Sequence, residues 1–173
     1  MQLKNKRIAV LAENNYEPRE LWCPRYRLEE EGAEVHILGT GAAAYSSKQG
    51  LEVQVDHNVA DVKAEDYDGV VIPGGYAPDA MRRHKPLIDF VRNLFDQGRV
   101  VAYICHAGWV AASADIVRGK RVTSFASIRD DMVNAGADWV DEPVVRDGNL
   151  ISSRVPSDLP AFHRTLIEAL AEG

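Results

Sequence analysis

The residues best suited to chemistry are Cys105 and His106, which stand side by side at the end of an apolar run. The run, residues 100–104, is rich in β-branched side chains, and Ala107 and Gly108 lead from the pair into an alanine-rich helical pattern. A buried strand, a nucleophile on a sharp turn and a helix behind it form a nucleophile elbow. Because a helix N-terminus favours the thiolate, the pattern predicts Cys105 as the nucleophile.

Each member of the pair also has a purely structural interpretation. Free cysteine is often a small buried hydrophobe, which is the alternative for Cys105. His106 is a candidate general acid and base, and its N–H together with that of Gly75 is a candidate oxyanion hole. Adjacent residues on a turn point in different directions, so His106 could instead bond to solvent or backbone at the start of the helix.

Further candidates surround the pair in the predicted fold. Gly74 and Gly75 follow a buried strand at residues 68–72 and allow backbone to approach a ligand, although a plain turn is the common alternative. Tyr16 and Trp109 are expected to line the pocket, with packing as their alternative. Cys23 lacks an elbow and is interpreted as structural. No metal site is expected, because the other histidines lack ligand spacing: His36, His57, His84 and His163.

Composition restricts the class of protein. The 173 residues carry a formal net charge of −6 and include 46% hydrophobic and 27% charged residues. This balance argues against nucleic-acid binding and suits one globular domain. The first apolar run, residues 8–12, is too short for a membrane span or signal peptide, and two cysteines do not suggest a disulfide scaffold. We therefore expect a cytoplasmic protein with reduced thiols and no membrane partner.

Predicted strands and helices alternate along most of the chain, which indicates an α/β sandwich with a mainly parallel sheet. Active sites in such folds lie beyond the carboxyl ends of the strands, where the loops after Ala12 and Ile72 and the Cys105 elbow should converge. The expected strands cover residues 7–12, 33–38, 51–56, 68–72, 99–104, 121–124, 140–147 and 149–153. The expected helices cover residues 17–31 with Pro24 inside, 86–97, the stretch behind the elbow to about 115, 127–135, and a last one capped by Asp158.

Four motifs in order resemble the PfpI family of the class I glutamine amidotransferase-like superfamily, over nearly the whole chain: Asn14-Asn15-Tyr16-Glu17, Pro73-Gly74-Gly75, Ile104-Cys105-His106 and residues 152–159. The resemblance implies a single domain over residues 1–173 with a flavodoxin-like three-layer sandwich. It also implies a homodimer or higher oligomer, a Cys nucleophile followed by His, and no cofactor. Ala107-Gly108-Trp109 departs from the Gly-Pro-Gln of many relatives, and Trp109 adds bulk beside the site.

The resemblance also assigns two carboxylates. It implies that Asp79 pairs with the catalytic histidine, in many members across a subunit interface; the alternative is an N-cap for residues 80–83. It places Glu17 against the Cys105 sulfur, where desolvation would raise its pKa and leave a protonated carboxyl that donates to the thiolate. The alternative for Glu17 is a first-turn acid that complements the helix dipole.

Three functions follow. The first is a cysteine-dependent deglycase or glyoxalase-like hydrolase that acts on small carbonyl compounds or glycated side chains in stress protection. The second is an intracellular cysteine peptidase or amidase that acts on peptides. The third is a redox sensor or chaperone without turnover, in which Cys105 is oxidised and held by Glu17.

Overall fold

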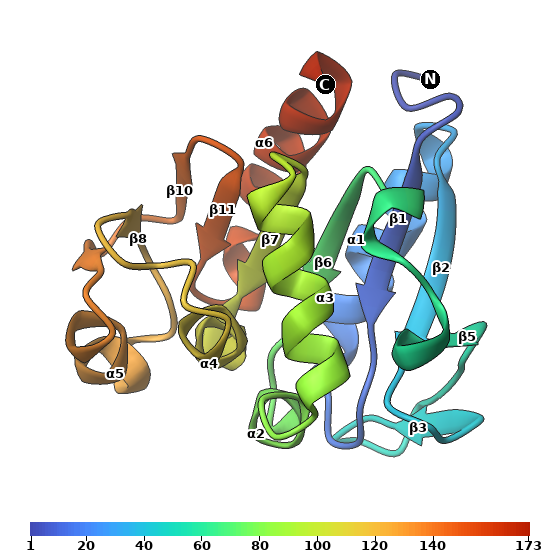
Figure 1. Ribbon diagram of the computed structural model, residues 1–173, viewed down its shortest axis with the longest axis horizontal. Coiled ribbons are helices and arrows are strands. Elements are labelled where there is room, and N and C mark those ends of the chain that lie inside the picture. The colour runs from blue at the N-terminus through green and yellow to red at the C-terminus, as the bar shows by residue number, and fades with distance from the viewer.

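Seven strands form one sheet through the middle of the computed structural model, which describes residues 1–173 (Figure 1). Their order is β10-β11-β7-β6-β1-β2-β5, and only β10 runs antiparallel to its neighbour. The strands are β1 (Arg7–Leu11), β2 (Glu34–Gly39), β5 (His57–Asn58), β6 (Gly69–Ile72), β7 (Val100–Ile104), β10 (Val144–Asp147) and β11 (Leu150–Ser153). The central strands β6 and β7 are buried throughout, as expected for a parallel sheet covered on both faces.

Helices cover both faces of the sheet, which confirms the predicted α/β fold class (Figure 1). α1 and α6 pack together on one face, and α3 and α4 lie on the other. α3 has one apolar face to bury, because its buried residues recur at helical spacing: Leu87, Phe90, Val91 and Leu94. The helices are α1 (Pro18–Glu30), α2 (Ala77–Met81), α3 (Lys85–Asp96), α4 (Gly108–Ser113), α5 (Arg129–Asn134) and α6 (Leu159–Glu172). None of them is both long and apolar enough to cross a membrane.

Two small sheets lie outside the main one. β3 (Ala44–Ser46) pairs with β4 (Glu52–Gln54), so the segment between the expected strands 33–38 and 51–56 contains a strand of its own. β8 (Arg121–Val122) pairs with β9 (Asp138–Trp139), a strand that was not expected. Both unexpected strands have two or three residues, too few to show a period-two pattern.

The start of α6 differs from the prediction for Asp158. Its carboxylate makes no capping bond to the helix but accepts from both Nε (2.9 Å) and Nη2 (3.1 Å) of Arg154. Two charge-assisted hydrogen bonds from one guanidinium stabilise the carboxylate more than a single hydrogen bond from a neutral N–H at the helix end. This pair fixes the loop at residues 154–158.

The topology places one crevice where a ligand can bind. From β1 the chain passes first to β2 on one side and later to β6 on the other, so the strand order reverses between β1 and β6. Open α/β sheets bind ligands at the carboxyl ends of the strands beside such a reversal. The segments that follow β1, β6 and β7 meet there.

Candidate functional site

Cys105 occupies a strained elbow at the end of β7. Its backbone has a φ of +63°, in the left-handed region that costs a residue with a Cβ roughly 1–2 kcal/mol. A single turn of 3-10 helix (Cys105–Ala107) follows and leads into α4. The N–H of Phe125 donates to the carbonyl oxygen of Cys105 at 3.2 Å, which holds the turn from outside. The side chain is buried, with 8% exposure.

The Gly74-Gly75 turn after β6 approaches so closely that only glycine fits. A Cβ on Gly74 would lie 2.8 Å from the Cβ of Cys105, and one on Gly75 would lie 2.5 Å from the backbone nitrogen of Glu17. Gly75 also has a φ of +80°. Its N–H and the N–H of His106 act on the Cys105 sulfur as backbone donors, and both lower the pKa of the thiol. These two donors are the ones predicted for an oxyanion hole.

His106 lies between the nucleophile and a serine. Its Nδ1 is 3.3 Å from Sγ of Cys105, and its Nε2 is 3.2 Å from Oγ of Ser127. The ring stacks on Phe125 at 4.7 Å between centroids and meets Trp109 edge-on at 5.3 Å. Adjacent residues on this turn therefore do form a thiol–imidazole contact.

A carboxyl group that the sequence analysis missed, that of Glu20, lies beside the elbow. The residue is fully buried on α1, and its Oε2 accepts from the N–H of Gly74 at 2.8 Å. Its Oε1 is buried without a hydrogen-bond partner. Burial raises the pKa of Glu20 to about 7, so this carboxyl gains and loses its proton near neutral pH.

Glu17, one helical turn earlier, does not have the protonation state expected for it. Its carboxylate caps α1 and accepts from Nε of Arg19 at 2.7 Å and from Nζ of Lys48 at 2.7 Å. Burial is the largest single effect and would raise its pKa, but the two cations together outweigh it, and the pKa is lowered. The expected protonated donor at Glu17 is therefore wrong, and Glu20 is the carboxyl that fits that description.

The expected thiolate is likewise corrected. Burial raises the pKa of the Cys105 thiol to about 12, and the nearby charge of Glu20 adds to this effect. The two backbone donors and Lys48 act in the opposite direction but do not compensate. Burial and the charge of Lys48 lower the pKa of His106. Both shifts favour a neutral thiol beside a neutral imidazole, whose Nδ1 lies within reach of the thiol proton.

A cavity of about 410 Å³ opens over these groups. Four of the predicted site residues line it, namely Glu17, Gly75, Cys105 and His106. Val155 and Pro156, from the fourth motif, also line it, and the lining residues that the sequence analysis did not identify are Arg19, Glu20, Lys48, Tyr76 and Phe125. The turn that carries Lys48 is tied to the site because its N–H donates to the carbonyl oxygen of Tyr16 at 3.0 Å.

The remaining predicted residues lie outside the cavity lining. Tyr16 is fully buried, with its hydroxyl donating to the carbonyl oxygen of Leu51 at 2.8 Å. Gly74 lies beneath the cavity against Glu20. Trp109 reaches the cavity only through His106, while its Nε1 donates to Asp131 at 2.8 Å. The chain brings no three His, Cys, Asp or Glu side chains together in a way that could hold a metal ion.

Asp79 does not contact His106 within this chain. Its exposed carboxylate pairs with Arg83, one turn further along, at 3.2 Å. Both ring nitrogens of His106 already have partners, in Cys105 and Ser127. A contact between Asp79 and a histidine would therefore need a second copy of the chain or a rearrangement, and the role expected for Asp79 stays a prediction.

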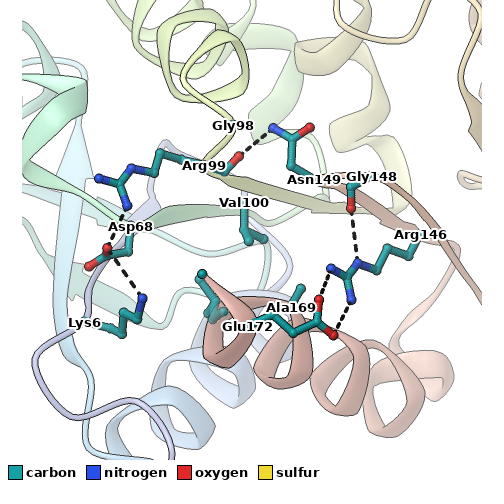
Figure 2. Close-up of a pocket in the computed structure, with 12 residues that line it drawn as sticks. Lys6, Asp68, Gly98, Arg99, Val100, Arg146, Gly148, Asn149, Ala169 and Glu172 are labelled. Atoms are coloured by element: carbon teal, nitrogen blue, oxygen red, sulfur yellow. Dashed lines mark hydrogen bonds and ion pairs between the residues drawn. The ribbon is translucent and has the colours of Figure 1, made fainter.

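A second cavity, of about 320 Å³, lies at the opposite, amino end of the strands (Figure 2). Its charged side chains pair with one another: Asp68 binds both Lys6 and Arg99, and Arg146 pairs with Glu172. It contains neither a nucleophile nor an unpaired charge among the labelled side chains. The chemistry of the chain is concentrated at the carboxyl end.

The chain matches the DJ-1/PfpI family over residues 6–169. It is 40% identical to deglycase PfpI of Pyrococcus furiosus over 95% of this chain and 99% of that protein. It is 36% identical to the putative cysteine protease YraA of Bacillus subtilis over 96% of this chain and 99% of that protein.

Solved structures agree with the sequence relatives. The DJ-1/ThiJ/PfpI-like part of a two-domain protein from Anabaena variabilis superposes with a TM-score of 0.94 at 42% identity, covering 96% of this chain and 48% of that one. DJ-1beta of Drosophila melanogaster gives a TM-score of 0.89 at 31% identity, covering 97% and 91%. The resemblance noted in the sequence is confirmed, and the chain belongs to the DJ-1/PfpI family.

Proposed function

We propose that the chain is a hydrolase that uses Cys105 on reactive carbonyls and on the early adducts that these form with amino acid side chains. The observation that carries the proposal is the contact between the Cys105 sulfur and the neutral imidazole of His106 inside a small cavity. Relatives named deglycase, such as the one from Pyrococcus furiosus, support the same class of substrate.

The first step with methylglyoxal is attack of the sulfur on the aldehyde carbon. A carbon–sulfur bond forms, the thiol proton passes to Nδ1 of His106, and the aldehyde oxygen becomes an alkoxide facing the N–H groups of Gly75 and His106. Return of the proton from His106 to that oxygen gives a neutral hemithioacetal and restores the imidazole. No oxidant is needed for this step.

The second stage moves a proton between the two carbons of the bound substrate. Removal of the proton from the former aldehyde carbon, with protonation of the ketone oxygen, gives an enediol. Delivery of a proton to the neighbouring carbon, with loss of the hydroxyl proton from the former aldehyde carbon, then gives the thioester of lactate. Glu20 suits this transfer because a carboxyl with a pKa of about 7 both accepts and donates near neutral pH. Water then cleaves the thioester, which releases lactate and restores the thiol.

The cavity also bears on the choice between substrates. Its volume of about 410 Å³ exceeds that of a three-carbon aldehyde and leaves room for a modified side chain beside the reacting atoms. The similarity to a putative cysteine protease keeps peptide hydrolysis as a second candidate, with the same sulfur and oxyanion donors. A role in stress protection and assembly into homo-oligomers in the cytoplasm belong to the same proposal.

The proposal is tested by incubating purified protein with methylglyoxal and measuring both its consumption and lactate formation. Cys105→Ser should abolish both, whereas Cys23→Ser, which removes the exposed second thiol, should keep the rate of the wild type. A parallel assay with a fluorogenic peptide separates the peptidase candidate. Equal lactate formation by Cys105→Ser and wild type, or its absence from wild type, would refute the carbonyl reaction.

A further inference from the structure

We infer that Lys48 is a specificity-determining residue that binds an anionic group of the substrate, so that the cavity favours carbonyl compounds with a carboxylate beside the reacting carbon. The inference rests on the proposed function and deepens it, because it names the kind of carbonyl compound that the same cavity takes. Lys48 and Cys105 both line the cavity of about 410 Å³. The ammonium group and the nucleophile therefore face the same small space.

The ammonium group of Lys48 keeps hydrogen-bond donors for a ligand. An ammonium carries three N–H donors. One of them serves the ion pair with Glu17, in which Nζ lies 2.7 Å from Oε2, and Lys48 forms no other ion pair within the chain. The side chain of Lys48 is 31% exposed, whereas that of Glu17 is 4% exposed. The buried carboxylate thus anchors the ammonium, and two donors stay available to an incoming carboxylate.

Lys48 is also the cation that acts on the reacting groups. Its charge acts to lower the pKa of both Cys105 and His106, and Cys105 in turn acts to raise the pKa of Lys48. Charge effects of this kind fall off with distance and are strongest where water is excluded. The other cation of the lining, Arg19, pairs with Oε1 of Glu17, and its side chain is 64% exposed. Lys48 is therefore the better placed of the two to meet a group attached to the reacting carbon.

The balance of charge around the cavity also favours an anion. The charged groups of its lining are the cations Arg19 and Lys48 and the carboxyls of Glu17 and Glu20. Burial raises the pKa of Glu20 to about 7, so below that pH this carboxyl is mostly protonated and the cations are in excess. The excess positive charge attracts an anionic substrate and does not attract a neutral one.

The backbone fixes Lys48 relative to the oxyanion donors. The residue lies in the turn between β3 and β4, which is closed by the N–H of Ser47 donating to the carbonyl oxygen of Leu51 at 2.8 Å. The N–H of Lys48 donates to the carbonyl oxygen of Tyr16 at 3.0 Å, and Tyr16 also forms a β-bridge with Gly75. Tyr16 therefore joins the turn that carries the ammonium to the turn that carries an oxyanion donor.

This arrangement fits an aldehyde with a carboxylate on the carbonyl carbon, of which glyoxylate is the simplest. Attack of the Cys105 sulfur on the aldehyde carbon, with transfer of the thiol proton to the aldehyde oxygen, gives a hemithioacetal as it does for methylglyoxal. The carboxylate accepts a charge-assisted hydrogen bond from Nζ of Lys48, while the former aldehyde oxygen faces the N–H groups of Gly75 and His106. A neutral aldehyde lacks the contact with Lys48.

The test compares the rates at which Cys105 reacts with iodoacetate and with iodoacetamide, two reagents of similar size that differ by one negative charge. In each reaction the sulfur forms a bond to carbon and iodide leaves, so the ratio of the two rates cancels any change in the protonation of the thiol. The rates are measured by mass spectrometry at pH 6.5 in a Cys23→Ser background, where Cys105 is the only thiol. The variants are Lys48→Met, Lys48→Arg and Glu17→Gln. Lys85→Met, which replaces an exposed lysine on α3, is the control.

We expect the ratio of the iodoacetate rate to the iodoacetamide rate to be higher for wild-type Cys105 than for 2-mercaptoethanol. Lys48→Met should lower this ratio roughly threefold to tenfold, between the effect of an exposed ion pair and that of a buried charged hydrogen bond. Lys48→Arg should keep most of the preference, and Glu17→Gln, which removes a competing carboxylate, should increase it. Lys85→Met should not alter it. Added salt should lower the ratio more in the wild type than in Lys48→Met.

An unchanged ratio in Lys48→Met would overturn the inference, and so would equal losses in the methionine and arginine variants, because they would indicate packing instead of charge. A second measurement follows the protection of Cys105 from iodoacetamide by glyoxylate, which should be lost in Lys48→Met and kept in Lys48→Arg. A preference for iodoacetate without protection by glyoxylate would overturn the carbonyl class together with the proposed function. The ratio needs no turnover, so it decides the role of Lys48 even if the protein forms no lactate.

Discussion

Replacing Glu20 by Gln should remove a pH-dependent loss of stability. The wild-type pKa rises from 4.5 in the unfolded chain to about 7 in the folded protein, because the carboxylate loses water on burial. A carboxyl whose pKa is raised by folding does not change the free energy of unfolding at pH values below its pKa in the unfolded chain, because it is then protonated in both states. Between 4.5 and 7 the unfolded state ionises first, so the folded protein loses about 3 kcal/mol of stability across this window, at about 1.4 kcal/mol per pH unit.

Gln keeps an oxygen for the N–H of Gly74 but cannot ionise. The free energy of unfolding should be measured by urea titration, followed through tryptophan fluorescence, at several pH values from 4.5 to 8. The free energy of unfolding of Glu20→Gln minus that of the wild type should increase by about 3 kcal/mol between the lowest and the highest pH of this range. All other titrating groups are common to the two proteins, so their effects cancel in the difference. Glu29→Gln, an exposed carboxylate on the same helix, is the matched control. A difference that stays flat with pH would refute the assignment of the protonated carboxyl to Glu20.

Three other predictions test separate parts of the site. Glu17→Gln should show the opposite pH dependence, because folding lowers the pKa of Glu17. The ionised carboxylate stabilises the folded protein by about 1 kcal/mol through two partly exposed cations, and this stabilisation is present above pH 4.5 and lost as the pH falls. Urea titrations of both proteins at several pH values would show the difference. Gly75→Ala should lower stability by more than about 1 kcal/mol and abolish lactate formation, because its φ of +80° and the nearby nitrogen of Glu17 exclude a Cβ; wild-type activity would contradict this. Iodoacetamide at pH 8 should alkylate the exposed Cys23 before the buried Cys105, as peptide mapping can show; the reverse order would mean that Cys105 rests as a thiolate.

The elbow and the fold class could be predicted from sequence because the patterns that encode them are local. β7 is a short apolar run that ends at a reactive residue, and α3 repeats its apolar positions at helical spacing. Such patterns fix an element and its buried face without knowledge of the rest of the chain. The strands of two or three residues carry no such pattern.

The carboxyls show what the sequence could not decide. Glu17 and Glu20 are separated by one helical turn, so both point toward the same side of α1. What separates them is contact with cations, because Arg19 and Lys48 both bind the carboxylate of Glu17 and keep it ionised, and Lys48 comes from a loop about 30 residues away. One signal for Glu20 was present, because it precedes the buried positions Leu21, Pro24 and Leu28 on the apolar face of the helix.

The protonation state of Cys105 depended on quantities that a motif does not contain. A helix N-terminus and two N–H donors favour a thiolate, as expected from the elbow, but the degree of burial decides the sign of the shift. Ser127 was missed for a related reason, since it reaches His106 from 21 residues away through a turn with no motif of its own.

The role of Cys105 is tested most directly by stopping the reaction with methylglyoxal in acid during turnover and mapping covalent adducts by mass spectrometry. We expect a lactoyl or hemithioacetal adduct on the peptide that contains Cys105, present at early times and lost as substrate is consumed. We expect no transient adduct on the peptide that contains Cys23. Lactate formation with no adduct on Cys105, or with an adduct only on Cys23, would contradict the central claim that Cys105 is the nucleophile.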